Sequence, residues 1–223
     1  NVAVGFEAGI AVTTGVDNTF IGGLAGDATT DADGNVAVGK SALSGNVLGG
    51  ASVAIGKNAL AAQNPATATS MLNTAVGANA GQSVTTGTFN TFVGGLAGDA
   101  TDDGQSNTAV GYLALSANCG NGNTSIGKQN LTVCTGAENT SLGVGAGYQV
   151  TSGDNNVLIG YESGRTGSPG GAITTADNTL CLGDERITAS HVQVDWTVAS
   201  DQRDKTDFTA LDLGLDFVKA LAP

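Results

Sequence analysis

Residues 18–43 read NTFIGGLAGDATTDADGNVAVGKSAL, and residues 90–115 repeat most of this stretch as NTFVGGLAGDATDDGQSNTAVGYLAL. Both copies contain the pattern Asn-x-x-aliphatic-Gly twice. The pattern occurs ten times, with Ser52 once in place of Asn, and its glycines are Gly5, Gly22, Gly39, Gly56, Gly77, Gly94, Gly111, Gly127, Gly143 and Gly160. A period of about 17 residues that recurs so regularly predicts a solenoid in which each repeat forms one coil.

The residues of the pattern alternate in a way that predicts a short β-strand. The residue before each Gly is Val, Ile or Leu, and the residue two positions before this aliphatic residue is Val or Thr. We expect the aliphatic residue to face the core and the Gly to bend the backbone. We expect the Asn to hydrogen-bond neighbouring backbone and to form a ladder through the stack. The predicted fold is all-β, a parallel β-roll or β-helix with coils of about 17 residues.

The fourth residue after each Gly follows a slower pattern, with Gly in two successive repeats and Leu in the next two. This pattern predicts a block of four coils, about 72 residues long, in which Leu side chains fill space left by Gly in other coils. The residues at this position are Gly9, Gly26, Leu43, Leu60, Gly81, Gly98, Leu115, Leu131, Gly147 and Gly164.

Two segments interrupt the period and are candidates for binding. Four extra residues lie around 64–70, and a longer gap separates Gly160 from Gly183. Insertions in repeat proteins go to outward loops, which often form the binding face. The predicted binding residues are Asn64, Thr67 and Ser70 in the first loop, and Arg165 and Ser168 in the second.

Carboxylates cluster in the turns 27–35 and 99–107. Asp31 and Asp33 match part of a calcium-binding loop, although no Glu follows at the distance that would complete the site. Three interpretations stay open: residues that shape a turn, a calcium site, or the carboxylate pair of a capsule polysaccharide depolymerase. Repetition of the cluster in equivalent loops favours the structural role. No cofactor is expected.

The composition limits the partners that the chain is expected to bind. A net charge of −12 disfavours nucleic acid and anionic membrane surfaces. The 35 glycines and 4% aromatic residues suit a thin ordered fold better than a globular core. With no long apolar run and no signal-peptide pattern, we expect no membrane insertion. Cys119 and Cys134, close to one repeat apart, either pair between neighbouring coils or remain free, and Cys181 is the third cysteine.

The repeats NTAVG, SVAIG and NTSIG resemble the head repeats of trimeric autotransporter adhesins, and NTAVGYLAL at 107–115 is similar to repeats of phage and algal-virus tail fibres. The resemblance covers residues 1 to about 165. It implies a homotrimeric, extracellular virion tail fibre that attaches to a glycan or protein receptor on the host cell. Other virion fibre or baseplate proteins would be its further partners. A bacterial trimeric surface adhesin is the alternative.

Residues 178–208 resemble the junction before the C-terminal intramolecular chaperone of tail spikes and endosialidases, with Ser200-Asp201-x-Arg203-x-Lys205 matching the start of that chaperone. The resemblance implies self-cleavage between Ala199 and Ser200 in a longer parent protein. Ser200 would be the nucleophile and Lys205 the general base. The apolar spacing from Leu211 to Leu221 predicts an amphipathic helix.

The chain is thus expected to divide into three parts. These are a repeat shaft at 1–165, a loop and trimeric β-stalk at 166–199, and the truncated beginning of the chaperone at 200–223. The segment 178–199 holds Trp196 in a strand-like stretch with no partner in its own chain. Three such strands wound around one axis would bury that side chain, which is a second reason to expect a homotrimer.

Overall fold

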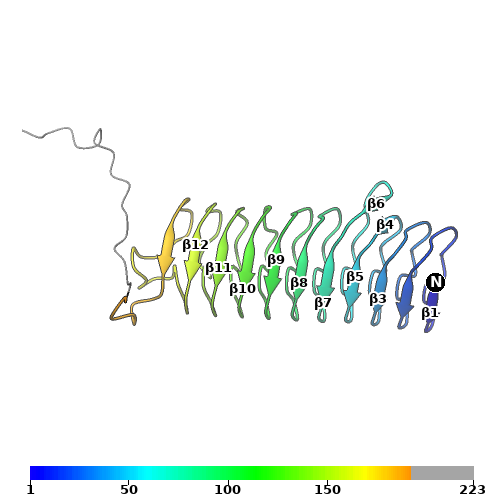
Figure 1. Cartoon of the computed structure of the whole chain (residues 1–223), viewed down its shortest axis with the longest axis horizontal. Coiled ribbons are helices and arrows are strands. Elements are labelled where there is room, and N and C mark those ends of the chain that lie inside the picture. The colour runs from blue at the N-terminus through cyan, green and yellow to red at the C-terminus, as the bar shows by residue number, and fades with distance from the viewer. Residues whose placement is uncertain (192–223) are drawn as a thin grey trace, which may run out of the picture. The chain divides into compact units, whose positions relative to one another are not determined.

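The computed structural model describes residues 1–191, and its compact unit is Asn1–Thr188. The unit is an all-β solenoid in which eleven strands form one parallel sheet along its length (Figure 1). No helix occurs in residues 1–191, and the helix predicted after residue 200 lies outside the described residues. The eleven strands, here called rungs, are β1 (Val2–Val4), β2 (Thr19–Ile21), β3 (Val36–Val38), β5 (Val53–Ile55), β7 (Thr74–Val76), β8 (Thr91–Val93), β9 (Thr108–Val110), β10 (Thr124–Ile126), β11 (Thr140–Leu142), β12 (Val157–Ile159) and β13 (Leu180–Leu182).

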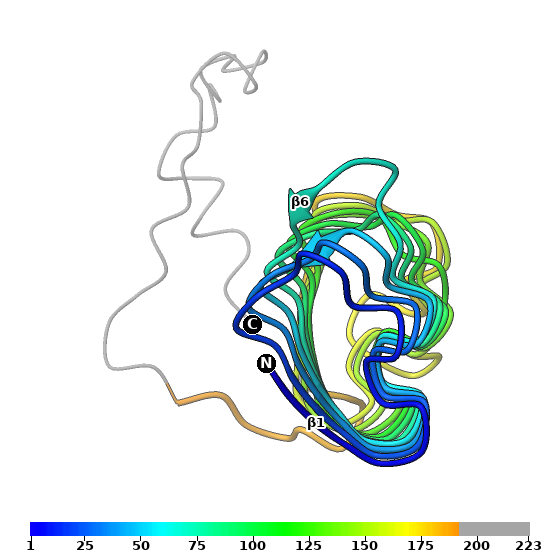
Figure 2. The same ribbon diagram turned by 90° about the vertical axis from the view of Figure 1, so that its right-hand side faces the viewer.

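Each rung pairs residue for residue with the rung one repeat later, so the coils superimpose when viewed along the stack (Figure 2). Thr91 of β8 pairs with Thr108 of β9, and Val93 pairs with Val110. Backbone bonds extend the register beyond the three-residue strands, as where the Gly94 amide donates to the Val76 carbonyl at 2.8 Å. The predicted parallel β-helix is confirmed, and its coils of about 17 residues are those that the repeat predicts.

The solenoid continues past residue 165, where the sequence analysis ended the repeat shaft. After the long step from Gly160 to Gly183, β13 pairs in parallel with β12 and adds the last rung. A second, two-stranded sheet joins β4 (Gly49–Gly50) to β6 (Thr69–Ser70) beside the main one.

The prediction that the aliphatic residue before Gly points into the core is wrong, because the strands turn this residue outward. The central residue of each rung is inside instead: Phe92 is 0% exposed, whereas its neighbour Val93 is 37% exposed. Alternation along a strand separates two faces but does not say which one is inward. The buried Asn before each strand settles the choice, because it lies two residues before the central residue and so shares its face.

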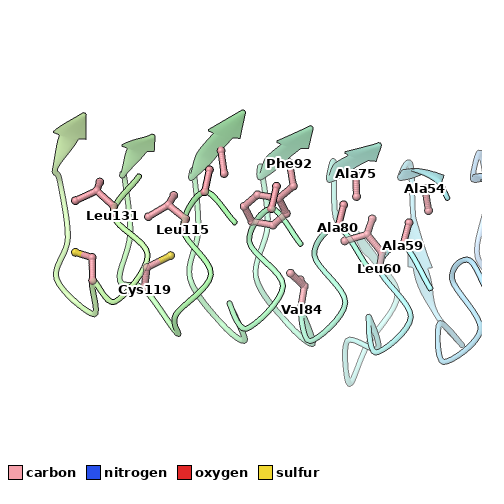
Figure 3. Packing of buried hydrophobic residues seen from close by; sticks show 14 of the residues in the cluster. Ala54, Ala59, Leu60, Ala75, Ala80, Val84, Phe92, Leu115, Cys119 and Leu131 are labelled. Carbon is pink, nitrogen blue, oxygen red and sulfur yellow. The ribbon is translucent and has the colours of Figure 1, made fainter. Parts of the chain in front are cut away.

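The core is filled by a size exchange between the rung and the turn that follows it (Figure 3). Phe92 occupies the space over two glycines, since a Cβ on Gly98 would lie 2.5 Å from its ring and a Cβ on Gly81 2.9 Å. In the following coil the rung residue is Ala109, and Leu115 from the turn is fully buried. Each coil therefore has a large side chain either at the centre of its rung or in the turn after it. Where it has neither, a large side chain of a neighbouring coil fills the space.

The predicted filling of glycine space by Leu is confirmed, because a Cβ on Gly81 would also lie 2.9 Å from Leu60. Sequence reasoning missed the second and larger filler, the rung residue Phe20 or Phe92. These phenylalanines lie four coils apart and mark the predicted four-coil block.

The predicted asparagine ladder is confirmed, and it joins side chains to backbone. The Asn90 Oδ1 accepts the Asn107 amide at 2.9 Å, and its Nδ2 donates to the Gly104 carbonyl at 2.8 Å. The side chain is fully buried. The bond from the next coil's amide recurs at Asn1, Asn18, Asn35, Asn73, Asn107, Asn123, Asn139 and Asn156. Each Asn thereby satisfies buried backbone groups that the short strand leaves unpaired.

One coil lacks its Asn, and a glutamine from its turn takes over part of the role. The Ser52 hydroxyl lies 3.2 Å from the Gln63 Oε1, which also accepts the Asn73 Nδ2 at 3.0 Å. The Gln63 side chain is fully buried. This is the coil with the four-residue insertion, so the altered turn and the altered ladder occur together.

The size exchange in the core predicts a compensating pair of substitutions. Phe92→Ala should lower the free energy of unfolding by about 3–5 kcal/mol, because it empties space over two coils. Adding Gly98→Leu should restore roughly half of that loss, since the pair copies the Ala109 and Leu115 arrangement and leaves only the space over Gly81 empty. Leu is compatible with the backbone, because φ is +60° at Gly98 and +49° at Leu115. Urea unfolding of both variants measures this, and no gain from Gly98→Leu would contradict the exchange.

The asparagine ladder predicts a large cost for removing one side chain. Asn90→Ala leaves the Asn107 amide and the Gly104 carbonyl buried without these partners, which should cost about 2–4 kcal/mol in unfolding experiments. Asn64→Ala, at an exposed residue outside the ladder, is the matched control and should leave the unfolding midpoint unchanged.

Candidate functional site

The insertion around 64–70 forms a loop that leaves the stack of otherwise similar coils (Figure 2). The Asn64 amide donates to the Thr85 carbonyl at 3.0 Å, and the Met71 amide donates to the Gly50 carbonyl at 2.9 Å. Met71 is fully buried and Pro65 is buried as well, so both ends of the loop are fixed to the solenoid. Asn64 and Thr67 are exposed on the loop.

A shallow pocket of about 400 Å³ lies at the base of this loop. It joins the loop residue Ser70 to the carboxylates Asp31 and Asp33, which the sequence analysis treated as separate candidates. Its lining residues are Asp17, Asp31, Ala32, Asp33, Gly34, Leu48, Gly50, Ala51, Ala68, Thr69 and Ser70. Their place in the coils explains the meeting, because Asp33 and Gly50 lie two residues before Asn35 and Ser52, and Gly50 pairs with Ser70 in the second sheet.

The pocket carboxylates accept hydrogen bonds from the preceding turn. The Thr13 and Thr14 hydroxyls donate to the Asp31 Oδ1 at 2.7 Å each, and these bonds lower the pKa of Asp31. The Val16 amide donates to the Asp33 Oδ1 at 2.7 Å. Over residues 1–191, no group of three or more His, Cys, Asp or Glu side chains is placed to hold a metal ion, so the calcium interpretation gains no support. These bonds give Asp31 and Asp33 a structural role between neighbouring coils.

A second shallow hollow, about 540 Å³, crosses several coils on the turn side. Its residues are Ala61, Ala62, Gln82, Ser83, Thr85, Ala100, Asp102 and Asn118. The Thr85 hydroxyl donates to Asp102, so this carboxylate also serves an inter-coil bond. Beside it, Asp99 has a buried Oδ1 without a hydrogen-bond partner, and burial raises the pKa of its carboxyl group.

The second predicted binding loop begins near Arg165, whose guanidinium binds Glu162 at 2.5 Å and lies 5.2 Å from the centre of the Tyr148 ring. Ser168 is only 6% exposed, and its hydroxyl donates to the Glu162 carbonyl at 3.2 Å, which places it inside the loop. The loop follows β12, whereas the 64–70 loop precedes β7, so the structure does not bring the two candidate loops together.

A pair of Arg–Tyr stacks beside this loop was missed by the sequence analysis. Arg186 lies 4.4 Å from the centre of the Tyr161 ring and donates to the Asp184 Oδ2 at 2.7 Å. These bonds from Arg186 lower the pKa of Asp184. Tyr148 and Arg165 stand one repeat apart in the sequence, whereas the approach of Arg186 to Tyr161 is visible only once the step across 160–183 is known.

The three cysteines are free and buried. Burial raises the pKa of Cys119 and raises that of Cys134 to about 11, so both are held as thiols at neutral pH. This geometry agrees with the free-thiol alternative. The predicted autocleavage residues Ser200 and Lys205, together with Trp196, lie outside the described residues.

Comparison with family models, with curated proteins and with solved structures finds no match for this chain. The part of the chain that the structure describes contains no helix long and apolar enough to cross a membrane.

The buried oxygen of Asp99 predicts a pH-dependent gain from Asp99→Asn. Because the folded-state pKa is raised, the wild type loses stability as pH rises from the ordinary aspartate range through the folded-state value. The variant should therefore melt at a higher temperature than wild type at pH 7, and the gap should close on acidification through that window. Asp103→Asn, which removes an exposed carboxylate from the same turn, should show no such gap. A constant difference at all pH values would contradict this assignment.

Proposed function

We propose that the chain is the shaft of an extracellular virion fibre that attaches to the host cell surface through the 64–70 loop. The observation that carries the proposal is this loop itself, an outward insertion anchored at both ends in a stack of regular coils. A stiff solenoid holds such a loop in place without needing a globular core. The exposed polar residues Asn64 and Thr67 suit hydrogen bonding to a glycan or to a polar protein receptor.

The proposal includes a homotrimer. The residue before Gly in each rung is an aliphatic side chain that faces outward, and these residues form a column along all eleven rungs. Contiguous exposed apolar surface of this kind marks interaction sites. Three copies would also present three loops, and simultaneous engagement raises the overall affinity for a surface that carries many receptors.

Two further parts of the proposal concern the longer parent protein and rest on the resemblances. The parent would bind other fibre or baseplate proteins of the virion, and it would cut itself before Ser200 with Lys205 as the base. The alternative function, a bacterial trimeric surface adhesin, uses the same loop and the same rod. A depolymerase would need a carboxylate pair that acts across a bound sugar, whereas Asp31, Asp33 and Asp102 accept inter-coil hydrogen bonds.

The loop predicts a specific loss of binding. Asn64→Ala with Thr67→Ala should weaken binding to a glycan array, or to susceptible cells, by about tenfold or more, because two exposed hydrogen-bonding groups are lost from each copy. The matched control is Thr86→Ala with Ser152→Ala, two exposed polar residues in uninterrupted turns, which should bind as wild type does. Circular dichroism should be the same for all three proteins. If the loop variant binds as strongly as wild type, the receptor contact lies elsewhere on the chain.

An antibody raised against residues 1–191 separates the two functional classes. Labelling of tails on purified virions supports the proposed fibre. Labelling of the envelope of uninfected cells would instead support the surface adhesin.

A further inference from the structure

One face of the solenoid is formed by four outward columns. Alternation along the chain turns outward the residue before each Asn, the first and third residues of the rung, and the residue after the Gly. In the coil of β8 these are Phe89, Thr91, Val93 and Gly95. We call this surface the outer face, the column before Asn its entry column, and the column after Gly its exit column.

The two edge columns of the outer face are inversely related in size over the coils from β2 to β10. Where the entry residue is large the exit residue is small, as with Phe89 and Gly95 or Leu72 and Ala78. Where the exit residue is large the entry residue is small. The pairs of this second kind are Gly34 with Lys40, Ala51 with Lys57, Ser106 with Tyr112, and Gly122 with Lys128. The relation ends at the coil of β11, where Glu138 and Val144 are both sizeable, and it is absent from the coil of β12, where Asn155 and Tyr161 are both large.

Contacts within one chain do not account for this relation. Six residues of extended chain separate the two edges of a coil, about 20 Å. A Cβ on Gly95 would lie 3.6 Å from Tyr112 and 3.9 Å from the Ala78 carbonyl, and no atom of Phe89 lies within 4 Å of it. Gly95 also has no positive φ that would require glycine.

The entry position has a left-handed φ in every coil from β2 to β12, so Phe89 is unusual there for its large apolar side chain. Its φ is +61°, a left-handed conformation that costs roughly 1–2 kcal/mol for a side chain with a Cβ, and the side chain is 56% exposed. Leu72 shares both properties, with φ +54° and 49% exposure. A large apolar residue in this conformation gains nothing from the solvent that surrounds it in a single chain. A covering partner would account for both residues.

We propose that the entry column of one copy packs against the exit column of a second copy, in parallel and in register, so that Phe89 of one lies against Gly95 of the next. The inference rests on the proposed self-association of the fibre and names its contact. Only a partner with the same rise per rung, about 4.8 Å, matches the outer face over its length of about 50 Å. A second copy of this chain has that rise.

Charge supports the same pairing. All three lysines of residues 1–191, Lys40, Lys57 and Lys128, lie in the exit column. The acidic pocket described above belongs to the entry edge, because Asp17, Gly34 and Ala51 line it together with Asp31 and Asp33. In register, the lysines at 40 and 57 of the next copy face this pocket. Lys128 faces Gly122, with Glu138 one rung away.

Each contact joins two different edges, the entry column of one copy and the exit column of the next. Parallel copies that are joined through such contacts form a closed ring. A parallel two-fold dimer also places each entry column against an exit column, so the columns fix which edges meet, and the homotrimer proposed above sets the ring at three chains. The homotrimer expected from the sequence is a ring of this type.

Disulfide mapping of the full chain tests the contact. In Phe89→Cys with Gly95→Cys, the two thiols are about 20 Å apart in one chain, too far to pair internally. Oxidation should therefore join neighbouring copies into a covalent ring, and a non-reducing gel should show a band of three chains. The register control is Phe89→Cys with Lys57→Cys, which places the exit thiol two rungs away, about 10 Å, and should not cross-link. The unmutated chain, with buried cysteines, gives the background.

Two results overturn the proposal. One is cross-linking of Phe89→Cys alone, which would show that entry column lies against entry column. The other is absence of covalent rings from an oxidised, folded double variant. Because the 64–70 loop lies outside the substituted columns, its receptor binding is measured separately and can persist when the contact fails.

A size exchange gives an independent measurement. Gly95→Phe should reduce the fraction of assembled protein at least tenfold in light scattering, because it meets Phe89 of the neighbour. Adding Phe89→Gly should restore assembly. Ala62→Phe, at an exposed residue on the turn side, should assemble as wild type does. Equal assembly by Gly95→Phe alone would contradict the contact.

Discussion

The hydrogen bonds of the buried asparagine determine the geometry of every coil. Asn90 joins the amide of the next rung to its own coil and also binds the following turn, so it sets the register and the inward direction at once. Once this side chain points inward, alternation assigns each residue near it to a face. The central rung residue enters the core, and the four columns of the outer face are left outside. The orientation of the aliphatic residues is thus a consequence of a polar interaction.

The narrow core explains how a chain with 40% hydrophobic residues can leave many of them exposed. Rung residues and the turn residues four positions after Gly fill it, together with a row of buried Ala and further residues such as Val84 and Val150, and a Phe in one coil is matched by Gly in that coil and its neighbour. So few inward positions per coil cannot bury every Val and Ile of the repeat. The remainder lie on the outer face, where Ile21, Ile55 and Ile126 form part of the exposed column that the proposed assembly would cover.

The period alone predicted the coils, their parallel stacking and the outward position of the insertion, because spacing fixes which residues become neighbours in a stack. It did not predict which face of the strand is inward, since alternation is symmetric. The signal was present in the central residues, which are mostly Ala or Ser and fit a tight interior. The pocket beside Ser70 was also within reach, because Asp33 and Met71 occupy equivalent positions two coils apart. The stack of Arg186 on Tyr161 could not be predicted from the sequence, since the long step from Gly160 to Gly183 hides which residues are neighbours there.

The position of the insertion would link the proposed assembly to the proposed receptor binding. Residues 64–70 end just before Leu72, so the loop leaves the solenoid at the entry column of the outer face. Asp17 belongs to that column and also lines the pocket at the base of the loop. In a ring of parallel copies, the lysines of one copy would neutralise the acidic base of the loop on the next, which stabilises the loop from below and leaves Asn64 and Thr67 at the surface. Each receptor-binding loop would then be complete only in the assembled fibre.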